Sequence, residues 1–514
     1  MLGLERGILE QVGHCWSNNN TSLTLEQVTH TSLPGDVAAP DGSFESVLEG
    51  LSADTVYFLR AYAIYLSQGR RDTVYETGFK NFTPVPLNII ATSIRLEDVN
   101  VRVTSAITGL AQNTATAFGH CWSNQTETPR VGDGVSKYSD FGILDRDSVF
   151  EDYLPGLQLA KTYYVRAYVT TGGKTFYSNV LSIFVGDKWV QRADFPKYVI
   201  DPVGFCLDEK IYIGLGRDLT VWEETYENRF WRYDPQTNIW AQVADFPGIP
   251  RRAAESFVVA GKAYVGFGIG KSNTISPSNI YAYSAEQNAW VEKASFPGDG
   301  RFSASAFSIG NKGYISCGHS ANGSLNETWC YDPLDVSNGK DVNGDPMGRW
   351  VRKSDFAGSP RTNAIAFAIA GKGYLGTGLT VTPNVGPTAY FNDFWEYDPA
   401  DSSTGLDDTG QPKGRWVQRA DCGTINRYES LGYSIGDFGY VIGGRSNGFG
   451  FLHDCWRYNP KTDRWTLVNS IPDGNEIHDS DGVAVSSASR GYVFNPVGGF
   501  GVFLNTFWEN IPFQ

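Results

Sequence analysis

The sequence predicts an all-β protein, with two small β-sandwiches at residues 1–88 and 89–186 and a six-bladed β-propeller at residues 187–514. Three observations predict this fold class. Aromatic residues make up 14% of the 514 residues and glycines number 57, whereas long helical patterns are absent. The first part of the chain repeats one strand-rich pattern twice. The second part repeats another pattern about every 50 to 65 residues, and short apolar runs punctuated by Gly at such a spacing are typical of propeller blades.

Charge and cysteine content exclude several classes of function. The formal net charge is −14 and the 42 Lys and Arg residues form no run, so we expect neither a nucleic-acid partner nor an anionic membrane surface. No apolar run approaches the roughly 18 residues of a membrane span, so no membrane-spanning segment is expected. The seven cysteines form no Cys-x-x-Cys pair, which favours buried thiols, although Cys317 and Cys330 on neighbouring strands leave a disulfide open.

Residues 1–186 contain two copies of one module. The run Gly13–Ser17 recurs as Gly119–Ser123, and the run Tyr57–Tyr62 recurs as Tyr163–Tyr168. Apolar residues alternate with polar or small ones in these runs, which is the period of a strand with one buried face. Each copy is therefore predicted to be a small β-sandwich.

The Gly-x-Cys-Trp-Ser strand and the strand ending in Arg-Ala-Tyr resemble the fibronectin type III-like modules of bacterial surface proteins. Two strands' worth of sequence precede the Cys-Trp strand in the second copy but not in the first, so we expect the first module to be truncated at its N-terminus. The resemblance implies a place outside the cytoplasm, at the cell surface or in the periplasm, with a lipid anchor on a missing N-terminal segment as one option. Trp16 and Trp122 are expected in the cores, and His14 and His120 lack the neighbours of a metal site.

The repeat from residue 187 onward combines an inner-strand aromatic residue, a Tyr seven residues later and a third-strand aromatic residue. The inner-strand positions are Phe205, Phe257, Phe307, Phe367, Tyr433 and, in a degenerate last copy, Val485. With its Gly-rich second strand, Tyr-Asp-Pro turn and fourth-strand Trp, this pattern resembles the kelch repeat. Six copies predict six blades. The strand from Trp189 to Phe195 is predicted to close the ring as the fourth strand of the last blade, which removes exposed sheet edges.

Two of the repeats have longer connections between their third and fourth strands, at residues 334–348 and 400–414. In the first, Asp341-x-Asn343-x-Asp345 resembles the start of a calcium loop, but no Glu occupies the twelfth position. We expect polar hairpins, and calcium binding by the first stays open.

One position of the repeat carries a candidate ligand site. The resemblance implies that the first strand of each blade lines the central channel, and the residue six before the inner-strand position starts that strand. These residues are Val199, Arg251, Arg301, Arg361, Arg427 and Asp479. Four guanidinium groups at one mouth would attract a carboxylate, phosphate or sulfate. The structural alternative is that these arginines bond to carbonyls or acids of the adjoining blade.

The loops between second and third strands would decorate the same face. They supply the candidate ligand contacts Trp222, Glu224, His319 and His453. Aromatic rings beside polar groups suit a carbohydrate, because a ring can cover a sugar face while polar groups bind its hydroxyls.

The same residues bear on two enzyme hypotheses. The kelch-type copper oxidases need two His, two Tyr and a Cys, and no such set is recognisable, so no metal and no cofactor are expected. The run Lys210–Gly216 resembles the first blade of the six-bladed kelch enzymes that interconvert sialic acid anomers. In such an enzyme Glu224 or Asp479 would be candidate acid or base groups. No catalytic residue is assigned.

The leading hypothesis is a non-catalytic, surface-exposed binding protein, monomeric, that recognises a glycan or another anionic ligand on the Arg-lined face. The alternatives are a sugar anomerase at the same face and a protein–protein adhesion module that uses the loop rim.

Overall fold

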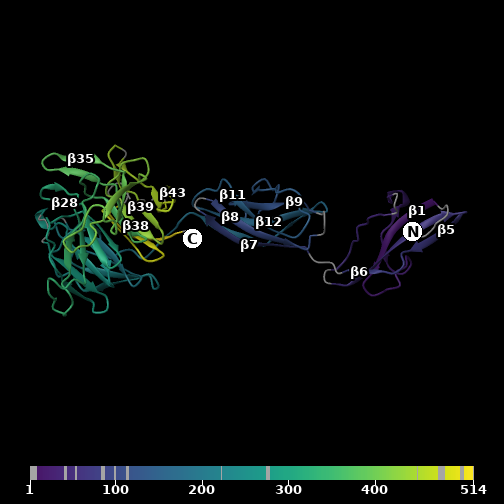
Figure 1. The fold of residues 1–514 in the computed structure, drawn as a ribbon, viewed down its shortest axis with the longest axis horizontal. Helices are drawn as coiled ribbons and strands as arrows, with labels where there is room; N and C mark the ends of the chain where they lie inside the picture. The colour runs from purple at the N-terminus through teal and green to yellow at the C-terminus, as the bar shows by residue number, and fades with distance from the viewer. Residues whose placement is uncertain are drawn as a thin grey trace. The chain divides into compact units, whose positions relative to one another are not determined.

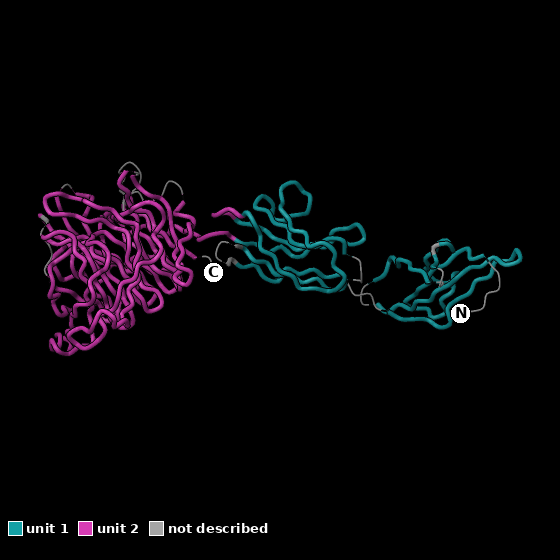
Figure 2. Tube along the Cα trace, turned by 45° about the horizontal axis from the view of Figure 1, so that its top comes forward, with its two compact units in different colours: residues 1–156, 162–183 teal, residues 157–161, 184–514 magenta. Residues whose placement is uncertain are grey.

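The computed structural model describes residues 8–39, 43–52, 55–82, 87–97, 100–110, 115–221, 223–273, 278–448, 450–472, 481–497 and 503–512. The chain divides into two compact units, residues 1–156 with 162–183 and residues 157–161 with 184–514 (Figure 2). The described regular structure is β-strand apart from two three-residue 3-10 helices, Gly35–Val37 and Lys271–Asn273, which confirms the all-β prediction. No described helix has the length and apolar character needed to cross a membrane.

The first module forms one antiparallel sheet in its described residues. Its strand order is β2-β1-β4-β5, while β3 pairs with β1 and β6 pairs with β4. The strands are β1 (Ile8–Ser17), β2 (Thr29–His30), β3 (Leu33–Pro34), β4 (Tyr57–Ser67), β5 (Arg70–Tyr75) and β6 (Lys80–Phe82). Cys15 and Trp16 are buried on β1, and the hydroxyl of Tyr62 donates a hydrogen bond to the carbonyl of Thr31.

The second module has two sheets, β10-β9-β12-β13 with β14 paired to β12, and β11-β8-β7 (Figure 1). The strands are β7 (Asn88–Glu97), β8 (Asn100–Thr108), β9 (Ala115–Ser123), β10 (Lys137–Tyr138), β11 (Ser148–Leu154), β12 (Lys161–Thr171), β13 (Lys174–Tyr177) and β14 (Leu181–Val185). Ile107 of one sheet packs in the same cluster as Phe118 and Val169 of the other, so apolar side chains fill the space between the sheets. Trp122 is 2% exposed, as expected of a core residue.

The larger unit contains six four-stranded antiparallel sheets among its described residues. The first sheet consists of β17 (Val203–Leu207), β18 (Lys210–Gly214), β20 (Phe230–Asp234) and β21 (Ile239–Val243), and the second of β22 (Glu255–Val259), β23 (Lys262–Gly266), β24 (Ile280–Ser284) and β25 (Ala289–Glu292). The third sheet consists of β26 (Ser305–Ile309), β27 (Lys312–Ser316), β30 (Thr328–Asp332) and β31 (Arg349–Arg352), and the fourth of β32 (Ile365–Ile369), β33 (Lys372–Gly376), β36 (Phe394–Asp398) and β37 (Arg415–Arg419). The fifth sheet consists of β38 (Leu431–Ile435), β39 (Phe438–Ile442), β42 (Cys455–Asn459) and β43 (Arg464–Val468), and the sixth of β44 (Val483–Ser486), β45 (Gly491–Val497), β46 (Phe503–Ile511) and β15 (Lys188–Gln191).

The last sheet joins the two ends of this unit. Its fourth strand is β15, which pairs antiparallel with β46 so that Trp189 lies opposite Asn510. The first strands of successive sheets contact one another in the order β17, β22, β26, β32, β38 and β44, and β44 contacts β17 again. The inner strands therefore surround a common axis.

Aromatic side chains at repeated positions join neighbouring sheets. Within one sheet, Phe307 stacks on Tyr314 with 5.3 Å between ring centroids and 3° between ring planes, and equivalent stacks occur in three other sheets. Tyr314 also contacts Tyr397 of the next sheet, with 5.7 Å between ring centroids. The indole N–H of a fourth-strand Trp donates to a backbone carbonyl just after the fourth strand of the preceding sheet. The pairs are Trp240 to Ala193 (2.9 Å), Trp290 to Ala244 (3.0 Å), Trp350 to Ala294 (3.2 Å) and Trp465 to Ala420 (2.8 Å). Each bond contributes about 1 kcal/mol beyond ring burial.

The two long hairpins fold back onto the preceding sheets. The buried ammonium of Lys293 contacts Asp341 of the first hairpin and donates to the carbonyl of Pro346. Lys353 makes the equivalent contacts with Asp407 and Pro412 of the second. Asp341, the first carboxylate of the run that resembles a calcium loop, therefore forms an ion pair with Lys293. This contact agrees with the expectation of a polar hairpin.

All seven cysteines are free thiols, so the disulfide left open for Cys317 and Cys330 is not formed. Burial raises the pKa of both thiols to about 11, which keeps them protonated near neutral pH.

Candidate functional site

The four repeated arginines, Arg251, Arg301, Arg361 and Arg427, lie inside the sheets and are at most 1% exposed. Each donates from Nη1 to a carbonyl that follows the second strand of its own sheet; the acceptors are Phe267 (3.0 Å), Cys317 (3.1 Å), Thr377 (2.9 Å) and Gly443 (3.3 Å). Three of the guanidinium groups also contact a Phe ring five residues earlier in the chain, with 5.2, 4.8 and 4.7 Å to the ring centroid.

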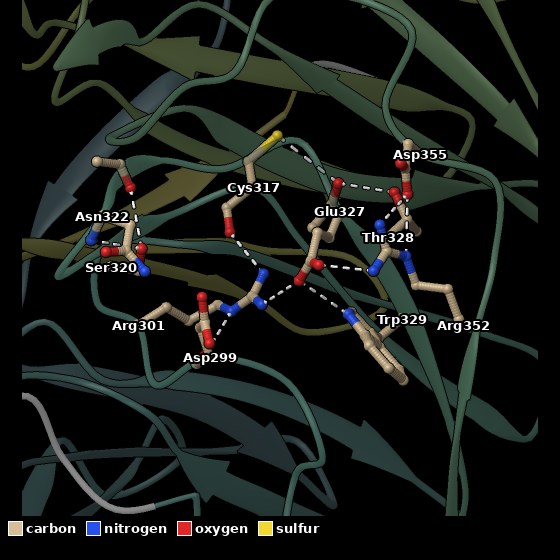
Figure 3. A network of polar contacts seen from close by, with 12 residues as sticks. Asp299, Arg301, Cys317, Ser320, Asn322, Glu327, Thr328, Trp329, Arg352 and Asp355 are labelled. Atoms are coloured by element: carbon tan, nitrogen blue, oxygen red, sulfur yellow. Dashed lines mark hydrogen bonds and ion pairs between the residues drawn. The ribbon is translucent and has the colours of Figure 1, made fainter. Parts of the chain in front are cut away.

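Three of these arginines also bind an acid that precedes the third strand of the same sheet. The pairs are Arg301–Glu327, Arg361–Asp393 and Arg427–Asp454. Figure 3 shows the first pair, in which Glu327 also accepts from the Trp329 indole and from Arg352. Arg251 has Asn279 at the equivalent place, and its burial lowers its pKa to about 10.

The predicted Arg-lined mouth therefore differs from the observed arrangement. The guanidinium groups are enclosed by carbonyls, acids and rings of the chain, and none of the four lines the central cavity. The observed bonds match the structural alternative, except that the partners belong to the same sheet rather than to the adjoining one. Direct ligand binding by these arginines stays a prediction.

The inner strands enclose a cavity of about 680 Å³ at the end where each first strand begins. Its wall comes from the residues one to five positions after the repeated arginine, together with side chains of the hairpins that connect second and third strands. Those hairpins are β28 (His319–Ser320) with β29 (Gly323–Ser324), β34 (Leu379–Thr382) with β35 (Gly386–Tyr390), and β40 (Arg445–Ser446) with β41 (Gly450–Phe451). In the first sheet, β19 (Arg217–Asp218) instead pairs with β16 (Val199–Ile200), which precedes the first strand.

A series of backbone hydrogen bonds between neighbouring sheets runs along the rim of this cavity. Five of the six rim residues donate an N–H to the carbonyl of the rim residue in the preceding sheet: Asp201 to Asp481 (2.7 Å), Ala253 to Asp201 (3.0 Å), Ser303 to Ala253 (3.2 Å), Asn363 to Ser303 (3.1 Å) and Glu429 to Asn363 (3.1 Å). The five donors have φ between 46° and 55°, a left-handed conformation that is costly for non-glycine residues. The bonds between sheets hold this strained rim in place.

Charged side chains stand around the rim. Asp201 pairs with Arg252, and Glu429 pairs with Arg445 at 3.2 Å while accepting from the Asn363 amide at 3.1 Å. All five residues line the cavity, and the four paired side chains are between 21 and 34% exposed. The rim thus offers donors and acceptors to a bound molecule.

Glu255 is a cavity residue that the sequence analysis did not single out. It starts the inner strand β22 and lines the cavity. Enclosure raises the pKa of its carboxyl well above the ordinary value, although the backbone of Ala304 stabilises the charged form. The corresponding residues of the other inner strands are Val203, Ser305, Ile365, Leu431 and Val483. Glu255 is therefore the one acid at a repeat position that otherwise has apolar or small residues, and this difference could have marked it in the sequence.

Of the predicted loop residues, His319 alone is a cavity residue among those described. Its ring lies 5.1 Å from that of Phe302, its Nδ1 has no hydrogen-bond partner in the described structure, and burial lowers its pKa. His453 is exposed and outside the cavity wall.

Glu224 also lies outside the cavity wall. It accepts a hydrogen bond from the Tyr226 hydroxyl, which lowers the pKa of the carboxyl, and another from the backbone of Ser272 at 3.2 Å. Trp222 and Asp479 lie outside the described residues. Among the described residues, no group of three or more His, Cys, Asp or Glu side chains could hold a metal ion.

Comparisons with known proteins connect the chain to one repeat family. Residues 440–472 match the family model described as the Kelch motif. N-acetylneuraminate epimerases of Yersinia pestis (strain Pestoides F) and Yersinia pseudotuberculosis serotype O:1b (strain IP 31758) are each 35% identical over 85 residues, 16% of this chain and 20% of theirs. The chain thus matches about a fifth of the length of these curated relatives.

A solved structure titled "Structure of YjhT" aligns with 70% of this chain and 99% of that chain, at 13% identity and a TM-score of 0.42. The kelch match includes part of β39 and all of β42 and β43, which belong to one of the six four-stranded sheets. The similarity to the Kelch motif therefore covers residues 440–472, which lie in one four-stranded sheet of this all-β structure.

Proposed function

We propose that the larger unit is a six-bladed kelch propeller that binds a saccharide in its central cavity. One observation carries this proposal: a cavity of about 680 Å³ whose rim is a ring of polar groups from all six sheets. Small-molecule sites usually have volumes of about 300 to 1,000 Å³ and a few fixed polar groups. The proposal keeps the ligand class of the sequence analysis but moves the site from the buried arginines to the residues that follow them.

The rim chemistry suits sugar hydroxyls. Carboxylates such as Glu429 accept hydrogen bonds from hydroxyl groups, whereas the amide of Asn363 and the hydroxyl of Ser303 can donate or accept. The strained backbone holds these groups in a fixed arrangement, which reduces the entropy lost when a ligand binds. Binding without catalysis is the function proposed first.

The test uses the full chain in thermal-shift titrations with neutral, amino and acidic monosaccharides. Binding to the native state should raise the melting temperature with increasing ligand concentration. Asn363→Ala should weaken binding about tenfold, the value of one hydrogen bond of about 1.4 kcal/mol. Alanine already occupies the equivalent rim position at Ala253, also at positive φ, so this change is compatible with the backbone.

The control variant is Asn343→Ala in the exposed hairpin, which should bind as the parent does. Saccharide binding that Asn363→Ala leaves unchanged would place the site elsewhere. A protein partner that binds the full chain with the rim altered would support the adhesion alternative instead.

A second candidate function, interconversion of sugar anomers, is favoured by the carboxyl of Glu255. Opening a sugar ring requires a proton for the ring oxygen and a base for the anomeric hydroxyl. A carboxyl whose pKa is raised holds its proton to a higher pH than an ordinary carboxyl does, and it can donate this proton. The similarity to N-acetylneuraminate epimerases agrees with this chemistry. Nuclear magnetic resonance should then detect faster anomer exchange, lost in Glu255→Gln while binding persists; exchange no faster than in buffer would refute it.

We further propose that residues 1–88 and 89–186 are fibronectin type III-like spacers and that the protein works outside the cytoplasm. The repetition of the Cys-Trp strand, buried in both copies, supports a repeated spacer. In intact cells that produce the protein, added protease should cut it. Complete protection until the cells are lysed would contradict this placement.

A further inference from the structure

We infer that the central cavity selects saccharides that lack a carboxylate and binds a protonated amino sugar most tightly. This inference rests on the proposed function, because it names the ligand class of the same cavity. It differs from the sequence-based expectation of an anionic ligand. The charges of the cavity wall carry the argument.

Carboxyl groups outnumber guanidinium groups among the described residues of the wall. The four carboxyl groups belong to Asp201, Glu255, Glu429 and Asp481, and the two guanidinium groups to Arg252 and Arg445. Even if Glu255 keeps its proton, three carboxylates face two guanidinium groups. His319 adds no full positive charge near neutral pH, because burial lowers its pKa. The wall therefore has a net negative charge.

The two guanidinium groups are already engaged by acids of the wall. Arg252 contacts Asp201, and Arg445 contacts Glu429. A ligand carboxylate would compete with these acids, and it would leave one of them without its partner in a confined space. The remaining acids would also repel it, and at a partly buried wall this repulsion is screened less than in open solvent.

A protonated amine would be attracted by the carboxyl groups of the wall. Glu255 belongs to the second sheet and Glu429 to the fifth, so carboxyl groups face the cavity from different sides. An ammonium group offers three donors and no acceptor, which matches carboxylate oxygens. A neutral sugar has hydroxyls that can donate to the same oxygens without the Coulombic attraction, so its affinity should lie between the two charged classes.

Three sugars with a common ring test this order: glucosamine, glucose and glucuronic acid, titrated into the full chain at neutral pH and low salt. We expect glucosamine to bind at least about tenfold more tightly than glucuronic acid, with glucose between them. Added salt should reduce the difference between the two charged sugars, because it screens charges. Glucuronic acid binding as tightly as glucosamine, or more tightly, would overturn the inference while the proposed cavity site stands.

Glu255→Lys tests whether the wall causes the preference. This change replaces a carboxyl by an ammonium in the cavity, and it should shift the ratio of glucosamine to glucuronic acid affinity toward the acid by at least about tenfold. Glu286→Lys, on an exposed turn, makes the same substitution outside the cavity and should leave the ratio as in the parent.

A ratio that moves equally in both variants would mean that net charge alone decides, and the inference would fail. Circular dichroism and melting temperature show whether each variant is folded; if Glu255→Lys does not fold, Glu429→Gln, which removes a carboxylate of the wall and releases Arg445, should shift the ratio in the same direction. Binding of none of the three sugars would refute the proposed function itself, and the inference with it.

Discussion

Arg361 and Asp393 form a two-pronged ion pair within one sheet, with Nη1 2.5 Å from Oδ1 and Nη2 2.9 Å from Oδ2. The guanidinium is fully buried and also donates to the carbonyl of Thr377 at 2.9 Å. The pair joins the segment that enters the inner strand β32 to the loop that enters β36. The guanidinium of Arg361 therefore stabilises the segment that leads into the rim of the cavity through buried contacts outside the cavity wall.

The first prediction concerns this pair. Arg361→Met should lower the free energy of unfolding by about 3–5 kcal/mol, because it leaves the carboxylate of Asp393 without its partner in a largely buried position. Arg361→Lys should recover only part of the loss, since an ammonium cannot make two parallel bonds to the carboxylate. Urea unfolding measures both.

The matched control is Arg349→Met, which breaks a contact with Asp408 in which the two side chains are 31% and 64% exposed. Such a surface pair should contribute at most about 1 kcal/mol. Equal losses for the two variants would mean that the Arg361 pair is not structural, and the ligand role of the buried arginines would regain support.

A second prediction compares two arginines at the same repeat position. Arg301 has the carboxylate of Glu327 as a partner, whereas the equivalent neighbour of Arg251 is Asn279. Burial lowers the pKa of Arg251 to about 10; it also lowers the pKa of Arg301, where Glu327 opposes the effect. Below its pKa, the charged Arg251 side chain therefore destabilises the folded state.

Arg251→Met should therefore reduce the free energy of unfolding at neutral pH by less than Arg301→Met does. The loss for Arg301 includes one of the two ion pairs of Glu327, the other being with Arg352, whereas Arg251 has no acidic partner to lose. Urea unfolding of the two variants decides the comparison, and a larger loss for Arg251→Met would contradict the stated role of the acid.

The sequence predicted the all-β class and the kelch motif because these depend on periodic features. Strand alternation, the Tyr seven residues after each inner aromatic, and the Gly-rich second strand recur in several repeats, so errors at single positions do not matter. The repeated Trp residues of the fourth strands make equivalent bonds at Ala193, Ala244, Ala294 and Ala420.

The site could not be predicted in the same way, because a single residue of offset decides which side chain enters the cavity. Arg251 is buried within its sheet, whereas Arg252 is in the cavity wall. The left-handed residue at Ala253 turns the chain between them and the inner strand, and nothing in an Ala signals a positive φ. Glu255 was not predicted because the repeat pattern identifies residues that several copies share, and this acid occurs in one copy.

A third prediction concerns the hairpin at residues 400–414. The ammonium of Lys353 and the carboxylate of Asp407 are 6% and 1% exposed, and Lys353 also donates to the carbonyl of Pro412 at 2.9 Å. Lys353→Met should destabilise the protein by about 3–5 kcal/mol, because the carboxylate of Asp407 remains buried without its cation. Proteolysis should then cut within the hairpin earlier than in the parent.

The control for this hairpin is Lys461→Met, whose contact with Asp437 is 75% and 57% exposed. It should change stability by at most about 1 kcal/mol and leave the cleavage pattern unaltered. If Lys353→Met resists protease as the parent does, the buried pair does not hold the hairpin.

The last prediction follows from the carboxyl of Glu255, where desolvation raises the pKa well above its ordinary value. The folded protein holds this proton more tightly than the unfolded chain does. Between the ordinary and the raised pKa, the free energy of unfolding should therefore fall as pH rises through the titration of this group.

Glu255→Gln removes the titration and keeps the shape of the side chain. Relative to the parent, the variant should gain stability as pH rises from acid, where both residues are neutral, to pH values above the raised pKa. Urea unfolding across this range, with the exposed Glu286→Gln as the control, measures the difference. A Glu255→Gln variant that loses stability relative to the parent with rising pH would show that the cavity stabilises the carboxylate, and Glu255 could then not serve as a proton donor near neutral pH.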